Sequence, residues 1–242
     1  MTHNIDALRE RFHHLLDVLV NDYDFGCYID GCCPEELENG WWDNYTKAAE
    51  NLGIWTGTGA TKFVIGDDNC DYIIKFSPCD CDFDYCGREV EVYKEAEKAG
   101  HADKFAWCEY LFDYEFNDCF CLPVYVMEWC QCGYDMIDDE MDEYTFQRYC
   151  SSRGVDDNDN TREDYYNSDM RGEYQENMMV WAYSHWGLDY YAPSDENDIA
   201  RFMRKMFIND IHAGNWGWCN NRLVLVDYSG FGENFDERSI LY

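Results

Sequence analysis

Residues 54–76 read IWTGTGATKFVIGDDNCDYIIKF, and this stretch decides the fold of the N-terminal half of the chain. Its aromatic and β-branched residues are interrupted by a glycine-rich stretch, Gly57-Thr-Gly59, and by a polar turn, Gly66-Asp-Asp-Asn69. This pattern predicts three strands joined by two tight connections. Lys75 lies in the third strand, which is otherwise apolar, and a lysine is costly to bury there unless an acid pairs with it. The alternative is an edge position from which the amine reaches solvent.

Helices are predicted on the N-terminal side of this stretch. Apolar residues recur there at three- and four-residue steps, which predicts an amphipathic helix over about residues 4–21. The residues of this stripe are Ile5, Leu8, Phe12, Leu15, Leu16 and Leu19. Pro34 is expected to open a second helix, which would carry Trp41, Trp42 and Tyr45.

A helix and two more strands are predicted on the C-terminal side. Residues 85–99 are rich in good helix formers and end before Gly100. Aromatic-rich strands are predicted around residues 105–115 and 119–129, with a turn at Asn117-Asp118. The resulting order, β-β-β-α-β-β, indicates an antiparallel sheet with one helix.

The following segment is acidic and then becomes ordered again. Residues 133–176 hold 14 acidic and 4 basic side chains, and we expect them to form solvated surface, with a loop at residues 154–160. A helix is predicted next, capped by Ser194 after Pro193. Its stripe contains Asp198, Ile199, Phe202, Met203, Met206 and Phe207.

Polar side chains flank a hairpin that is predicted near the end of the sequence. The hairpin consists of strands 216–219 and 223–226 with a turn at Asn220-Asn221. Asn215 would precede its first strand and Asp227 would follow its second, while Asp210 lies five positions before Asn215. Carboxylate and amide oxygens are ligands of Mg²⁺, which often binds through one or two carboxylates together with substrate phosphates. The trio can therefore hold a metal–nucleotide complex.

The chain of 242 residues is strongly acidic, with 50 Asp and Glu against 18 Lys and Arg and a formal net charge of −32. Nucleic acid is therefore not expected as a partner, whereas a basic partner or bound cations are. With 46% hydrophobic residues, the chain can bury a large core as one unit or two packed lobes. The 14 cysteines lack zinc-knuckle spacing and Asp6 to Arg11 interrupt any signal-peptide core, so free thiols in a reducing cytoplasm are expected. No stretch has the length of a membrane span.

Taken in order, these pieces resemble the protein-kinase-like fold from about Gly53 to Gly232. Asp210-Ile-His-Ala-Gly-Asn215 is similar to the Asp-x-His-x-x-Asn catalytic loop of aminoglycoside phosphotransferases and related bacterial or phage kinase-like proteins. The resemblance implies an α+β, bilobal fold with a five-stranded antiparallel N-lobe sheet, one αC-like helix and a reduced, mainly helical C-lobe. The implied segments are an N-terminal helical extension at 1–50, the N-lobe at 51–130, and the C-lobe with an acidic insertion at 131–242.

The same resemblance implies an ATP-dependent phosphotransferase that moves the γ-phosphate of Mg-ATP to a hydroxyl acceptor. Lys75 would contact the α- and β-phosphates and would be oriented by Glu89, or by Glu91 if the helix is rotated. Asp210 would accept or orient the proton of the attacking hydroxyl, and Asn215 and Asp227 would bind Mg²⁺. The phosphate-covering loop would contain Gly57, Thr58, Gly59, Ala60 and Val64. The adenine pocket would contain Met127, with backbone groups of Glu128 and Cys130.

The sequence departs from the family pattern in several places. Lys62 stands where the pattern G-x-G-x-x-G-x-V has its third glycine. Ile208-Asn209 replaces the His-Arg pair before the catalytic Asp, and Asp227-Tyr-Ser229 replaces Asp-Phe-Gly. Fifteen residues follow Asp227, so we expect a C-lobe built from residues 133–207 without a peptide-docking platform.

Other functions stay open from the sequence alone. One is a catalytically inactive kinase-like module that binds nucleotide. Another is an acidic decoy that mimics nucleic acid and occupies a DNA-binding partner. Transfer of a nucleotidyl group in place of a phosphate is also compatible with the residues. For an active enzyme, the expected acceptor is a basic protein or a cationic small molecule, because the acidic field attracts cations.

Overall fold

The computed structural model describes residues 3–23, 53–58, 62–67, 71–77, 84–116, 120–132, 139–167, 171–192 and 196–230. Their contacts divide the chain into two compact units. The first unit is Met1–Glu95 with Ala106–Trp129, and the second is Ala96–Phe105 with Cys130–Tyr242. The secondary structure is mixed α+β with antiparallel sheets, as the sequence predicts.

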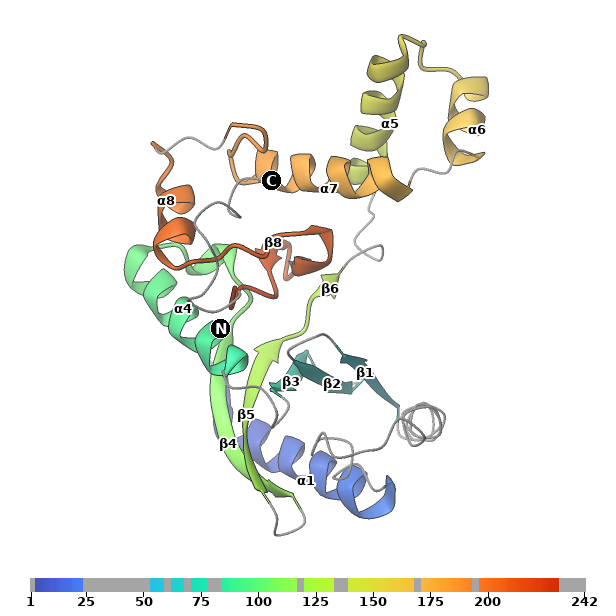
Figure 1. Cartoon of the computed structure of the whole chain (residues 1–242). Coiled ribbons are helices and arrows are strands. Elements are labelled where there is room, and N and C mark those ends of the chain that lie inside the picture. Colours follow the sequence, from blue (N-terminus) through green and yellow to red (C-terminus); the bar gives the residue numbers. More distant parts are fainter. Residues whose placement is uncertain are drawn as a thin grey trace. The chain divides into compact units, whose positions relative to one another are not determined.

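The first unit contains a sheet whose strands follow the order β1-β2-β3-β5-β4, with every neighbouring pair antiparallel (Figure 1). The strands are β1 (Ile54–Thr58), β2 (Phe63–Asp67), β3 (Tyr72–Phe76), β4 (Cys108–Phe116) and β5 (Phe120–Glu128). All of them lie where strands were predicted. β2 continues through Asp67, so the predicted turn at 66–69 begins later than expected; residues 68–70 and 117–119 lie outside the described residues.

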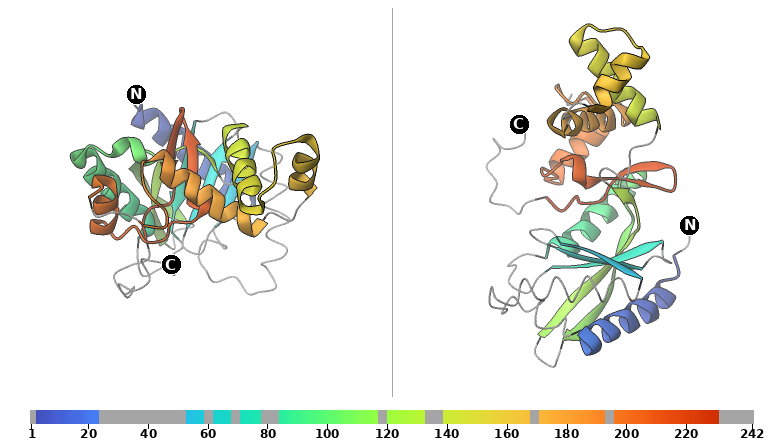
Figure 2. Two further views of the ribbon diagram at one scale, coloured as in Figure 1. Left: turned by 90° about the horizontal axis from the view of Figure 1, so that it is seen from above. Right: turned by 90° about the vertical axis from the view of Figure 1, so that its right-hand side faces the viewer.

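Two helices cover opposite faces of this sheet (Figure 2). They are α1 (Ile5–Tyr23), close to the predicted bounds, and α4 (Tyr85–Ala99), at the predicted bounds. Successive strand residues point to opposite faces, so Ile74 faces α1 whereas Lys75 faces α4. The core under α1 contains Leu8, Phe12, Leu16, Leu19, Ile54, Ile65, Ile74, Phe76, Leu111, Tyr114, Leu122, Val124 and Val126. α1, which we predicted as part of an N-terminal helical extension that packs on the core, lies in the first unit. The helix predicted from Pro34 lies outside the described residues.

The start of α4 is fixed by a polar contact with the sheet. The Asp84 side chain accepts a hydrogen bond of 2.9 Å from the backbone N–H of Gly87, which is the N-cap arrangement. The same carboxylate accepts the hydroxyl of Tyr125 on β5. A Cβ at Gly87 would lie 2.8 Å from that hydroxyl, so this close approach requires a glycine. The contact sets the position of the first turn of α4 against β5.

The second unit contains the predicted hairpin. β7 (Trp216–Cys219) and β8 (Arg222–Leu225) pair with each other, and β6 (Gln131–Cys132) pairs with β7. Asn220 and Asn221 have φ values of 48° and 60°, as a two-residue hairpin turn requires at both central positions. The hairpin is confirmed, with β8 ending one residue earlier than predicted.

The second unit contains four α-helices among its described residues. The sequence predicted that residues 133–207 form a mainly helical lobe, but it gave no bounds for the first three of these helices. They are α5 (Asp139–Arg153), α6 (Asp159–Asn167), α7 (Arg171–His185) and α8 (Asp198–Lys205). The acidic segment is therefore helical rather than loop-like, and α6 begins inside the predicted loop at 154–160. α5 and α6 pack through an aromatic cluster in which the Tyr165 ring contacts Phe146 and Tyr149 edge-on. The described acidic side chains of the two helices are exposed, namely Glu143, Asp159, Glu163 and Asp164. A charged sequence is therefore compatible with helices that pack through an aromatic cluster.

Both predicted ends of α8 were wrong. The N-cap is Asn197, whose side chain accepts hydrogen bonds from the backbone N–H groups of Ile199 and Ala200, and not Ser194. Phe207 is not part of the buried stripe, since it is 62% exposed and has a φ of 54° beyond the helix end. A positive φ turns the chain out of the helix, so Phe207 leaves the apolar face.

Among the described residues, no helix combines the length and apolarity that crossing a bilayer requires. The described cysteines that are free thiols are Cys86, Cys108, Cys121, Cys130, Cys132, Cys150 and Cys219.

Replacing Phe12 by Ala tests whether α1 is part of the sheet core. The Phe12 side chain is fully buried under the sheet, so its loss is expected to lower the free energy of unfolding by about 3–5 kcal/mol. Urea denaturation followed by tryptophan fluorescence measures this loss. His14→Ala, on the exposed face of α1, serves as the control and is expected to change stability by about 0.5 kcal/mol or less. Equal effects of the two substitutions would contradict this packing.

Candidate functional site

The predicted ion pair between Lys75 and Glu89 is present in the first unit. Lys75 Nζ lies 3.2 Å from Glu89 Oε1 and 3.1 Å from Oε2, and the pair joins β3 to α4. Both residues are buried, with exposed fractions of 5% and 1%. Glu91, the alternative partner, instead pairs with Arg88 at 3.0 Å on the outside of the helix. The rotation of α4 therefore selects Glu89.

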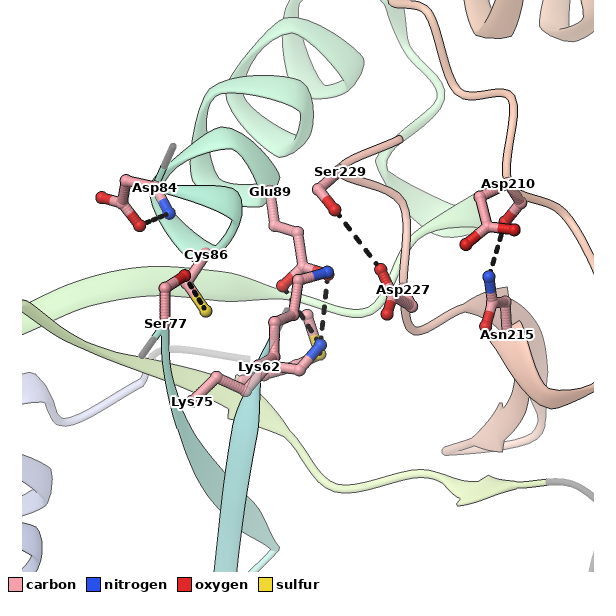
Figure 3. A network of polar contacts seen from close by, with 12 residues as sticks. Lys62, Lys75, Ser77, Asp84, Cys86, Glu89, Asp210, Asn215, Asp227 and Ser229 are labelled. Carbon is pink, nitrogen blue, oxygen red and sulfur yellow. Dashed lines mark hydrogen bonds and ion pairs between the residues drawn. The ribbon is translucent and has the colours of Figure 1, made fainter. Parts of the chain in front are cut away.

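Glu89 has a second cationic partner that was not predicted. Lys62 Nζ lies 2.8 Å from Glu89 Oε1, and Lys62 as a residue is 3% exposed (Figure 3). Lys62 immediately precedes β2, and Val64, two residues further on, is the partner of Lys75 across the strands. Because side chains alternate along a strand, Lys62, Val64 and Lys75 share the face that α4 covers. Two lysines thus converge on one buried carboxylate.

The surroundings of this cluster are apolar and contain a thiol. Met127 Sδ lies 3.5 Å from Lys75 Nζ, and the Met127 side chain is 1% exposed. Cys86, one turn before Glu89 on α4, accepts a contact of 3.7 Å from the Ser77 hydroxyl. Burial, and then the charge of Glu89, raises the pKa of the Cys86 thiol to about 12. Cys86 is therefore a neutral neighbour of the ion pairs.

Glu128 and Cys130, which were predicted to contact adenine through their backbones, form hydrogen bonds within the protein. The backbone N–H of Glu128 donates to the carbonyl of Trp107 at 2.9 Å, and the Glu128 carboxylate accepts from the Trp107 N–H at 2.9 Å. The Glu128 amide therefore already has a partner within the protein, and the role of the Glu128 backbone in an adenine pocket stays a prediction. The carbonyl of Cys130, in the second unit, accepts a 3.2 Å contact from the Cys132 thiol.

The predicted phosphate-covering loop is described only in part. Gly57 and Thr58 are the last residues of β1, and their backbones pair with Val64 and Phe63 of β2. Gly59 and Ala60 lie outside the described residues. The described part therefore places the beginning of the loop next to β2, which Lys62 directly precedes.

In the second unit, a short loop fixes Asn215. Its side-chain nitrogen donates to the backbone carbonyl of Asp210 at 2.5 Å, and its backbone N–H donates to the carbonyl of His212 at 2.9 Å. The carbonyl of Asn215 accepts the N–H of Val226 at 2.8 Å. Asn215 is 4% exposed, so a buried amide closes the loop and ties it to the end of β8. This bond to Val226 brings Asn215 beside Asp227.

The two residues after Asp227 in the sequence hold it in place. The Ser229 hydroxyl contacts Asp227 Oδ1 at 3.5 Å, and the Tyr228 ring is fully buried. That ring packs edge-on against Phe105, whose ring also contacts Phe202 of α8 and Trp186. The Tyr228 side chain therefore anchors the backbone at Asp227, while Asp227 itself is only partly buried.

The donor set around Asn215 and Asp227 fits a magnesium ion that is shared with phosphate oxygens. The amide nitrogen of Asn215 is engaged by Asp210, which leaves its oxygen on the opposite side, directed away from Asp210 (Figure 3). Asp227 supplies a partly exposed carboxylate. Within the described ranges, no group of three or more His, Cys, Asp or Glu side chains could hold a metal ion by itself. A cation here would therefore need ligand atoms from its substrate, as Mg²⁺ commonly does.

Comparisons with known proteins add little to this geometry. No protein-family model matches the chain, and no curated protein matches it. Among solved structures, it is similar to an aminoglycoside phosphotransferase from Alicyclobacillus acidocaldarius subsp. acidocaldarius DSM 446, with 15% sequence identity and a TM-score of 0.29. The match covers 74% of this chain and 63% of that protein, so the chain spans less than two thirds of its length.

Methionine substitutions test whether the two lysines share Glu89. Lys62→Met or Lys75→Met alone leaves the other lysine on the carboxylate, so each is expected to cost about 2 kcal/mol or less. The double variant removes both lysine partners, and breaking a buried pair costs about 3–5 kcal/mol. Its loss in urea denaturation is therefore expected to exceed the sum of the single losses by about 0.5–3 kcal/mol. Additive losses would argue against a shared carboxylate.

Alkylation of the thiols tests the environment of Cys86. Its raised pKa keeps the thiol protonated at pH 8, and the thiolate is the reactive form. Iodoacetamide is therefore expected to modify the exposed Cys121 well before Cys86, as read from peptide masses. Unfolding in urea should abolish the difference. Equal rates in the folded protein would show that Cys86 is accessible and that the cluster is open to solvent.

Proposed function

We propose that the protein is an ATP-dependent phosphotransferase with a kinase-like fold, which moves the γ-phosphate of Mg-ATP to a hydroxyl acceptor. The observation that carries the proposal is the buried ion pair between Lys75 on β3 and Glu89 on α4. A buried pair is weak evidence for stability, because the loss of hydration offsets much of the attraction. An ion pair that orients an ammonium group toward phosphates would have a function beyond stability.

Each predicted residue has a role in this proposal. Lys75, oriented by Glu89, binds the α- and β-phosphates. Asp210 takes the proton of the attacking hydroxyl, while Asn215 and Asp227 hold Mg²⁺. The metal neutralises charge on the phosphates when it is bound. The acceptor oxygen then forms a bond to the γ-phosphorus as the bond to the β-phosphate oxygen breaks, and ADP leaves.

The net charge of −32 favours a basic protein or a cationic small molecule as the acceptor. A field of this sign draws cations toward the protein and repels anions. Mg²⁺ gains importance for the same reason, since it reduces the charge of the ATP that must approach. Transfer of a nucleotidyl group is a variant of this function, and ATP labelled at different phosphates separates it from phosphoryl transfer.

A second candidate function is nucleotide binding without transfer. Lys62 favours it, because a buried lysine stands at the third glycine position and occupies Glu89 together with Lys75. In that case the same residues would bind the nucleotide but would not complete a reaction. Thermal stabilisation by Mg-ATP in the absence of any transfer would select this alternative.

Incubation with Mg²⁺ and ATP labelled separately at the γ- and α-phosphates tests the proposal. Label from the γ-phosphate, but not from the α-phosphate, is expected to reach a cationic acceptor or the protein itself. Asp227→Ala is expected to reduce the transfer about 100-fold or more, because a bound metal contributes several kcal/mol to catalysis. Asp156→Ala, at an exposed position between α5 and α6, should leave it unchanged. Absence of both binding and transfer would contradict the proposal.

A further inference from the structure

Lys62 is a buried lysine to which the proposed function assigns no role. It is a cation with 3% exposure, and its amine lies nearer to Glu89 Oε1, at 2.8 Å, than the amine of Lys75 does, at 3.2 Å. Burying an ammonium group is unfavourable unless it is paired, and Glu89 already has Lys75 as a partner. A second lysine at this carboxylate therefore points to a function beyond keeping the pair neutral.

The formal charges of the three side chains explain what the second lysine adds. Two ammonium groups and one carboxylate sum to +1, whereas Lys75 and Glu89 alone sum to zero. Lys62 thus adds one positive charge beside the Lys75–Glu89 pair, in surroundings that are largely withdrawn from water, where electrostatic attraction is strong. This local charge opposes the net charge of −32 that the whole chain presents to an approaching nucleotide.

Lys62 places its positive charge on the same face of the sheet as Lys75. Lys62 lies directly before β2, Val64 pairs with Lys75, and alternation puts both lysines on the face covered by α4. Figure 3 shows the two amine groups converging on the Glu89 carboxylate from neighbouring strands. Each ammonium carries three N–H donors, and for Lys75 one of its contacts is the long one to Met127 Sδ at 3.5 Å, a weak acceptor. A phosphate oxygen is a stronger acceptor than a thioether sulfur, so it would replace this contact without displacing Glu89.

We propose that Lys62 is a second phosphate-binding residue, so that a nucleoside triphosphate is held by two ammonium groups, Lys62 and Lys75, gathered on Glu89. This inference rests on the proposed function. A glycine at this position would let the backbone approach the phosphates, whereas here the side-chain amine makes the contact. Nucleotide affinity therefore depends on both lysines, and Lys62 compensates for the acidic field of the protein.

Nucleotide titration of matched variants tests this inference. Mg-ATP binding is measured by calorimetry for the wild-type chain, Lys62→Met, Lys62→Arg and Lys94→Met. Charge-assisted hydrogen bonds are strong enough that Lys62→Met is expected to weaken binding about 10- to 100-fold, while Lys62→Arg retains most of the affinity. Lys94, whose exposed amine pairs with Glu109 at 3.1 Å, is the control, and its replacement should leave binding unchanged.

The outcomes separate this inference from the proposed function. If the wild-type chain binds Mg-ATP and Lys62→Met binds equally well, the role of Lys62 is overturned while the proposed function stands. Tighter binding by Lys62→Met also overturns it, because Lys62 would then obstruct the phosphates. If the wild-type chain does not bind Mg-ATP at all, the proposed function fails and this inference fails with it.

Lysine labelling of the wild-type chain gives a second readout that does not depend on a variant folding. An ATP acyl-phosphate transfers its acyl group to amines that lie near the bound phosphates, with release of the nucleotide. Both Lys62 and Lys75 are expected to be acylated, and excess Mg-ATP is expected to protect them, whereas Lys94 should show no protection. Acylation of Lys75 with no modification of Lys62 would overturn the inference.

Discussion

The first unit depends on one interaction, because the carboxylate of Glu89 is buried and therefore needs cationic partners. Lys62 and Lys75 come from neighbouring strands, so a single side chain of α4 joins the helix to both. The ion pairs also fix which way α4 is rotated, because Glu89 points inward and Glu91, two positions later, points outward to Arg88. The buried apolar residues of α4 follow the same face, with Cys86, Val90, Tyr93 and Ala96 three or four positions apart.

The second unit positions its polar groups in a different way. Asp210, Asn215 and Asp227 are held by backbone hydrogen bonds and by the buried ring of Tyr228, and the two carboxylates remain partly exposed. A carboxylate that is to bind a metal has to stay accessible and ionised, so a rigid backbone serves better here than an ion pair. The hairpin turn at Asn220-Asn221 supplies this rigidity, because it fixes the register that sets Asn215 beside Asp227.

Much of this arrangement could be predicted because local patterns govern it. Strand alternation and turn residues placed the strands, and the good helix formers at 85–99 placed α4. The choice of Glu89 came from the resemblance to the kinase-like fold, with Glu91 left open. Other features depend on tertiary contacts that a single sequence does not contain. The acidic helices α5 and α6 gain their order from the packing of Phe146 and Tyr165, which the surrounding charges concealed. Lys62 was considered only as a missing glycine, although the alternation of Lys62, Val64 and Lys75 was a signal that could have placed it on the inner face. The Asn197 cap was missed because Ser194 is an equally good capping residue by type.

The central claim is the proposed one, that Mg-ATP binds to the chain and that its binding involves Lys75 and Glu89 as well as Asn215 and Asp227. Hydrogen–deuterium exchange of the whole chain, with and without Mg-ATP, tests this claim most directly. Slower exchange is expected in two separate segments, residues 62–89 and residues 208–228, while α6 should be unaffected and serves as an internal reference. Both effects should be weakened in Asp227→Ala, because the proposal assigns this residue to the metal of Mg-ATP. Protection in only one of the segments, or in neither, would contradict the claim.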